Sequence, residues 1–236
     1  MTSRGVVFDK DGTLVDFHAT WDPVFGAVLD ELAGHDPALW DRAAAVLGFD
    51  PARRALRHDS PLVAESNAEV ADRLAPLFGR PAGDVELLAS IERVIEATAS
   101  SAPVAVSGAG EVLAALAVRK IPMAVATNDA EASARLQLDR LGWAAHFVTV
   151  VGYDSGHGTK PEPGMVVACA AAMGCGPEQV VVVGDSRQDL LAARSAGALA
   201  VLVAGPTPRP GLADLCALAD VVLDSLAGVI DLVGGV

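Results

Sequence analysis

Short, continuously apolar runs recur along the chain, and most are followed by a stretch in which apolar residues recur at helical spacing. Strands that are apolar at successive positions are typical of parallel sheets, because helices cover both faces of such a sheet. The alternation predicts an α/β fold, a doubly wound parallel sheet with helices on both sides. The expected strands are 6–8, 122–126, 147–151, 180–183, 200–203 and 221–223. The expected helices are 111–119, 130–141, 165–173, 190–196 and 226–232.

The stretch 17–101 breaks this rhythm. It contains no convincing strand, and its Ala, Leu and Val residues recur at helical spacing with charged residues between them. Prolines stand where helices could begin or end. We therefore expect an all-helical domain, 17–101, inserted into an α/β core domain formed by 1–16 and 102–236.

Composition and charge narrow the classes of partner. Hydrophobic residues make up 52% of the 236, which is enough to bury a core, so disorder is not expected. The net charge of −13 disfavours a nucleic-acid partner, whose phosphates require a basic surface. The apolar stretches are too short to span a membrane and no secretory signal is visible, so we expect no membrane partner and a cytoplasmic protein. Nothing in the sequence predicts an oligomeric state.

Two carboxylates follow the first expected strand. Asp9 and Asp11 are spaced i, i+2, and Gly12 and Thr13 come next. Ligands of open α/β sheets bind at the carboxyl ends of the strands. Two close acids repel each other unless a cation lies between them, and Mg²⁺ prefers such oxygen ligands. The alternative is an ordinary turn after a strand.

Three further polar clusters follow later strands. Thr127 and Asn128 offer a hydroxyl and backbone N–H groups to an anion, or simply cap a helix. Lys160 stands among prolines in a loop; it is one of only three lysines, and its alternative is a solvated surface position. Asp185 and Asp189 could serve a metal site, or cap the next helix and favour its dipole.

The order of these clusters strengthens the functional interpretation. The carboxyl ends of parallel strands meet at one edge of a sheet, so all four clusters are expected to lie together. They supply what phosphoryl transfer requires: a nucleophile, a proton donor, a metal site and positive charge for the phosphoryl oxygens. Such a site would take a phosphorylated molecule as its partner.

With these motifs, the chain resembles the haloacid dehalogenase superfamily. The matching residues are Asp9-x-Asp11-Gly12-Thr13, Thr127, Lys160 and Gly184-Asp185-Ser186-x-x-Asp189. The helical insertion is similar to the family's first type of cap domain, and the loop 152–155 is similar to that of phosphoglycolate phosphatase-like enzymes. The resemblance implies a Mg²⁺-dependent phosphatase that hydrolyses a small phosphate monoester, phosphoglycolate-like or a sugar phosphate, with a small phosphorylated metabolite as its expected partner.

The resemblance also implies catalytic roles. Asp9 is expected to attack phosphorus and form an aspartyl phosphate. Asp11 is expected to protonate the leaving oxygen and then to activate water. Thr127 and the Asn128 N–H are expected to bind phosphoryl oxygens, and Lys160 to neutralise charge on Asp9 and the phosphoryl group.

A metal set follows from the same resemblance. Mg²⁺ is expected on the carboxylates of Asp9 and Asp185 and on the backbone carbonyl of Asp11, with Asp189 supporting that set. True dehalogenases of the superfamily lack the second acid of the first motif. Because Asp11 is present, phosphate chemistry is favoured over dehalogenation.

Two alternatives stay open at this point. A phosphomutase of the same superfamily keeps the same four motifs. A phosphorylation switch without turnover, similar to a response-regulator receiver, also uses clustered acids, a hydroxyl and a lysine. Receivers are about half this length and carry the acceptor after a later strand, which disfavours that interpretation.

The densest basic cluster lies in the insertion. Arg53, Arg54, Arg57 and His58 are candidates for selecting the substrate, because arginine suits a carboxylate or a second phosphate. The alternative is a solvated helix face. His18 follows the first motif closely and could line the entrance to the site.

Overall fold

The structure is a computed structural model that describes residues 5–57, 60–63, 65–99, 103–205 and 210–234. The chain divides into two compact units. The α/β unit comprises Met1–Asp16 and Ala105–Val236, and the inserted unit comprises Phe17–Val104.

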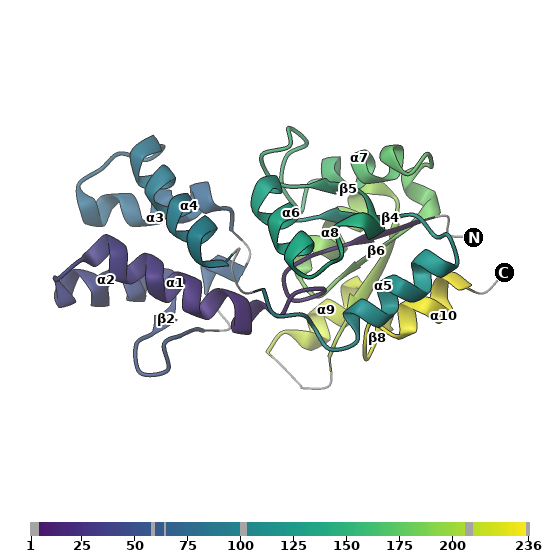
Figure 1. Ribbon diagram of the computed structural model, residues 1–236, viewed down its shortest axis with the longest axis horizontal. Helices are drawn as coiled ribbons and strands as arrows, with labels where there is room; N and C mark the ends of the chain where they lie inside the picture. Colours follow the sequence, from purple (N-terminus) through teal and green to yellow (C-terminus); the bar gives the residue numbers. More distant parts are fainter. Residues whose placement is uncertain (1–4, 58–59, 64, 100–102, 206–209, 235–236) are drawn as a thin grey trace. The chain divides into compact units, whose positions relative to one another are not determined.

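A six-stranded sheet forms the centre of the α/β unit (Figure 1), and every neighbouring pair of its strands is parallel. This confirms the predicted fold class. All six expected strands are present, in the order β5 (Phe147–Val151), β4 (Met123–Ala126), β1 (Gly5–Phe8), β6 (Val180–Gly184), β7 (Leu199–Val203) and β8 (Val221–Leu223).

The strand order matters for function because β1 lies between β4 and β6. In this register Phe8, the last residue of β1, is opposite Val125 and Val183. The three strands that precede the first, second and fourth motifs are therefore adjacent, and their carboxyl ends lie at the same edge.

Helices cover both faces of the sheet, and successive strand residues point to opposite faces. Val6 and Phe8 pack in one apolar cluster with residues of α5 and α10, whereas Val7 packs in another with residues of α7 and α8. The helices of this unit are α5 (Ala109–Val118), α6 (Glu131–Arg140), α7 (Gly164–Ala172), α8 (Arg187–Ala196), α9 (Leu212–Leu218) and α10 (Gly228–Gly234), with short 3₁₀ turns η3 (Ala144–His146) and η4 (Pro177–Gln179).

Two details of the helices differ from the sequence prediction. Helix α9 was not expected; Leu212, Leu215 and Cys216 pack against the core, but seven residues are too few for a helical repeat to stand out in the sequence. Helix α8 begins three residues before the expected start because Ser186 caps it, and the polar first turn carries no apolar signal.

The inserted unit has its own apolar core, in which Trp21 is buried. Its helices are α1 (Phe17–Ala33), α2 (Pro37–Leu47), α3 (Asn67–Leu74) and α4 (Val85–Ala99), with 3₁₀ turns η1 (Pro61–Val63) and η2 (Ala75–Phe78).

The expectation of an insertion without strands is wrong in one place. β2 (Phe49–Asp50) and β3 (Ala55–Leu56) form an antiparallel hairpin in which Phe49 is paired with Leu56. Both side chains are buried in the core of this unit. Two-residue strands are too short for an alternating pattern to show in the sequence, and this pair is held by burial.

Among the helices that the structure describes, none combines the length and apolar character that crossing a bilayer requires.

A core substitution on α5 tests the packing of the α/β unit. Leu113→Ala should lower the free energy of unfolding by about 2–5 kcal/mol, because the fully buried side chain leaves a cavity. Val118→Ala on the same helix is the matched control; its side chain is exposed, and the change should stay within about 0.5 kcal/mol. Urea unfolding followed by circular dichroism measures both, and equal effects would contradict the packing described.

Candidate active site

The first motif occupies a tight loop at the end of β1. Asp9 is 6% exposed, and its backbone N–H donates to the Val183 carbonyl at 2.8 Å, which continues the pairing with β6. Gly12 has φ of 88°, a conformation that favours glycine. A Cβ at Gly12 would also lie 2.6 Å from the Asp185 carboxylate oxygens. Glycine is therefore required here for its conformation and for the close approach of the two motifs.

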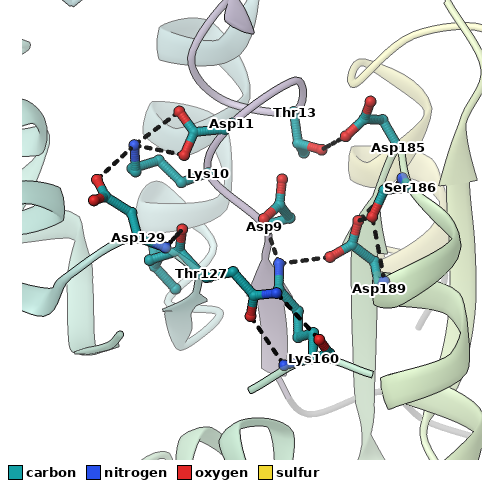
Figure 2. A network of polar contacts seen from close by, with 12 residues as sticks. Asp9, Lys10, Asp11, Thr13, Thr127, Asp129, Lys160, Asp185, Ser186 and Asp189 are labelled. Atoms are coloured by element: carbon teal, nitrogen blue, oxygen red, sulfur yellow. Dashed lines mark hydrogen bonds and ion pairs between the residues drawn. The ribbon is translucent and has the colours of Figure 1, made fainter. Parts of the chain in front are cut away.

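Lys160 joins the first and fourth motifs. Its Nζ lies 2.5 Å from Asp9 Oδ1 and 2.6 Å from Asp189 Oδ1 (Figure 2). The lysine is 6% exposed, so the alternative of a solvated surface position is wrong. The Asn128 side chain holds the Lys160 backbone with two hydrogen bonds: its Oδ1 accepts from the Lys160 N–H at 2.9 Å, and its Nδ2 donates to the Lys160 carbonyl at 3.1 Å. Asn128 of the second motif thus positions Lys160 of the third.

Asp189 has two structural tasks at once. In the cap of α8, Asp189 Oδ2 accepts from the Ser186 N–H at 3.0 Å and from the Ser186 hydroxyl at 2.6 Å. Its other oxygen faces Lys160. The helix-cap alternative is therefore correct for Asp189, and it does not exclude a role in the site. Gly184 makes room, since a Cβ there would lie 2.3 Å from the Asp189 Cβ.

The crowding of acids changes the ionisation of the site. Burial raises the pKa of Asp9 well above its usual value, repulsion by Asp189 raises it further, and Lys160 opposes both effects. Burial alone would lower the pKa of Lys160, but attraction by Asp189 and Asp9 raises it above its usual range. Lys160 is therefore an ammonium ion at neutral pH.

The donor set fits a hard divalent cation. Asp9, Asp185 and Asp189 each offer a carboxylate oxygen, and these oxygens lie within 4.8 Å of one another. Three carboxylates against the single charge of Lys160 leave two negative charges, which a divalent ion would balance. Mg²⁺ favours such oxygen ligands. The Asp11 carboxylate does not belong to this set and contacts Lys10 instead. Metal binding by the Asp11 backbone carbonyl stays a prediction.

The second motif does not cap the helix that follows it. Helix α6 begins at Glu131 with Ala130 as an N-cap that makes no side-chain bond. Its Glu131 N–H instead donates to Asp154 at 2.8 Å, from the loop after β5. The Thr127 hydroxyl accepts from the Asp129 N–H at 3.1 Å. Phosphate binding by Thr127 and the Asn128 N–H stays a prediction.

A second buried network was not predicted. Lys10 is fully buried, and its Nζ lies within 2.8 Å of both Asp11 oxygens, 2.8 Å from Gln137 Oε1 and 3.2 Å from Asp129 Oδ2. Burial lowers the pKa of Lys10, but Asp11 and Asp129 raise it more strongly, so the net shift is upward. Two features of the sequence could have indicated this network: lysine is scarce in the chain, and Lys10 stands between two acids.

The structure separates the members of the arginine cluster. Arg54 is paired with Asp30 at 2.8 Å and lies over the Trp40 ring. Arg53 and Arg57 line a pocket of about 540 Å³ within the inserted unit. His18 and Asp22 share that pocket, with the His18 ring nitrogen 3.3 Å from Asp22. His58 lies outside the described residues.

Known proteins resemble this chain in sequence and in fold. Residues 4–197 match the haloacid dehalogenase-like hydrolase family. A phosphoglycolate phosphatase from Rhodospirillum rubrum is 32% identical and covers 98% of this chain and 91% of its own length. A family hydrolase from Deinococcus radiodurans R1, solved with bound phosphate and sodium, is 28% identical with a TM-score of 0.62 and covers 97% of this chain and 93% of its own. A β-phosphoglucomutase from Clostridium difficile has a TM-score of 0.68 at 16% identity and covers 96% of this chain and 92% of its own. This last likeness shows the fold alone.

Cation binding can be measured without a substrate. Added Mg²⁺ should raise the melting temperature, by the equivalent of about 2.7 kcal/mol at one hundred times the Kd, because the folded state alone assembles the acids. Asp185→Asn should shrink that rise while slightly stabilising the cation-free protein, since one repulsive charge is removed. Asp214→Asn, an exposed acid on α9, is the matched control. A Mg²⁺ response that survives Asp185→Asn would contradict this assignment.

Proposed function

The chain belongs to the haloacid dehalogenase-like hydrolases, in the phosphoglycolate phosphatase-like subgroup, and is a phosphatase; from this premise, we propose that it hydrolyses a small phosphate monoester through an aspartyl phosphate on Asp9 with the aid of Mg²⁺. One observation carries the proposal. Asp9 contacts Lys160 and lies beside the Asp185 and Asp189 oxygens, and these three acids could hold a cation.

In the first step, an Asp9 oxygen forms a bond to phosphorus while the bond from phosphorus to the ester oxygen breaks. Asp11 donates a proton to that leaving oxygen. Lys160 stabilises the negative charge that Asp9 and the phosphoryl group bring together. Thr127 and the Asn128 N–H orient the phosphoryl oxygens.

In the second step, water attacks phosphorus and the bond to Asp9 breaks, which releases inorganic phosphate. Asp11, now deprotonated, takes the proton from the attacking water. Asp9, Asp185 and Asp189 would hold Mg²⁺, with the Asp11 carbonyl, and the ion would supply positive charge for the phosphoryl oxygens throughout.

The substrate class rests on the subgroup and on the inserted unit. Phosphoglycolate phosphatase-like relatives favour a small phosphorylated acid, and a sugar phosphate is the second candidate. Arg53 and Arg57 line a pocket of ligand size together with Asp50, whose carboxylate lies 3.9 Å from Arg53, whereas Arg54 contacts Asp30 and Trp40. We propose that these two residues select a carboxylate or a second phosphate, and that the inserted unit acts as a cap. A cytoplasmic location stays a prediction.

Removal of the nucleophile tests the mechanism. Asp9→Asn should lower phosphate release from a panel of small phosphate esters with Mg²⁺ by about three orders of magnitude or more, because an amide cannot form the acyl phosphate. Asp139→Asn, an exposed acid on α6, should match the wild type. Retained turnover in Asp9→Asn would remove Asp9 as nucleophile. Conversion of an ester into a phosphorylated isomer, without free phosphate, would identify a mutase instead.

Substrate selection has a separate test. Arg57→Ala should raise the KM for phosphoglycolate about tenfold, the value of a lost charge-assisted hydrogen bond, and leave the KM for a neutral alkyl phosphate unchanged. Arg54→Ala is the matched control, since its guanidinium is engaged by Asp30. Equal changes for both esters would contradict selection by Arg57.

A further inference from the structure

Lys10 is the least accessible charged side chain at the site. It follows the apolar β1 strand, where an apolar residue would pack without any loss of solvation, yet it is fully buried as an ammonium ion. Burying a lysine costs several kcal/mol unless its charge is paired and its donors are satisfied. The observed contacts with Asp11, Asp129 and Gln137 meet that requirement.

The contacts of Lys10 come from separate parts of the chain. Asp129 belongs to the loop after β4, and Gln137 lies on α6 and is fully buried. Both therefore hold the Lys10 ammonium from outside the loop that carries Asp11. Figure 2 shows the Asp11 carboxylate turned toward Lys10, whereas the Asp9 carboxylate is joined to Lys160. The two acids of the first motif are thus oriented by two different lysines.

We propose that Lys10 is the positioning residue for Asp11, held in place by Asp129 and Gln137. The inference rests on the proposed function, in which Asp11 exchanges protons with the leaving oxygen and with water. Asp11 stands in the turn after β1, and its side chain is 18% exposed. The contact of Lys10 with both carboxylate oxygens restricts it. General acid catalysis depends on how the acid is oriented toward the reacting oxygen, and the Lys10 contacts set the orientation of the Asp11 carboxylate.

The leaving group of the ester separates this role from a merely structural one. Phosphoglycolate releases an alkoxide that requires a proton, whereas p-nitrophenyl phosphate releases a stable phenolate that does not. Lys10→Met should lower kcat/KM for phosphoglycolate by about 10- to 100-fold, and for p-nitrophenyl phosphate by less than about threefold. The ratio kcat/KM reports the steps up to transfer of the phosphoryl group to Asp9.

Controls address folding and charge. Lys10→Met combined with Asp129→Asn removes one charge of each sign from the interior and should show the same leaving-group dependence. Gln137→Met keeps every charge and should give a smaller loss of the same kind. Lys120→Met, at an exposed lysine, should match the wild type with both esters. Melting temperatures verify that each variant is folded.

Asp11→Asn separates the two levels of the argument. It should slow phosphoglycolate far more than p-nitrophenyl phosphate; no such difference would overturn the acid role of Asp11 and the inference with it. If Asp11→Asn discriminates between the esters but the folded Lys10 and Gln137 variants lose both activities equally, or neither, the positioning role alone is overturned.

Discussion

The site depends on one electrostatic constraint: several carboxylates are gathered where water is largely excluded, and a phosphate dianion must join them. Lys160 compensates part of this negative charge, because its buried ammonium group lies between Asp9 and Asp189. A buried charge of this kind persists only when its partners are fixed. The Asn128 side chain fixes Lys160 through hydrogen bonds to its backbone, and the Ser186 hydroxyl fixes Asp189 by donating to its carboxylate. The remaining excess of negative charge defines the place for a divalent cation.

The sheet makes this arrangement possible. The central position of β1 between β4 and β6 brings three chain segments that lie far apart in the sequence, 5–8, 123–126 and 180–184, to one edge. Gly12 allows the first and fourth motifs to approach each other, because a Cβ there would meet Asp185, and Gly184 leaves room for Asp189 within the fourth motif. The geometry is therefore a matter of backbone packing as much as of charged side chains.

Two lysines contact the two acids of the first motif. Lys160 contacts Asp9, and Lys10 contacts Asp11. Each of the two carboxylates therefore has its own counter-charge and its own direction. In the inserted unit, charge is organised differently: Arg54 is bound by Asp30 and Trp40, and Arg53 and Arg57 line a pocket.

The sequence alone determined the strand and helix alternation and the four motifs, because buried parallel strands are continuously apolar and their polar ends stand out. It also identified Asp9, Lys160, Asp185 and Asp189, which the fold gathers. It did not predict the β2–β3 hairpin or helix α9, since two-residue strands and a seven-residue helix are too short for a periodic signal to stand out. Only the tertiary structure decided that Lys160 is buried rather than solvated, and that Lys10 joins Asp11 to Asp129 and Gln137. Those contacts depend on which segments the sheet and α6 bring together, and no local pattern records them.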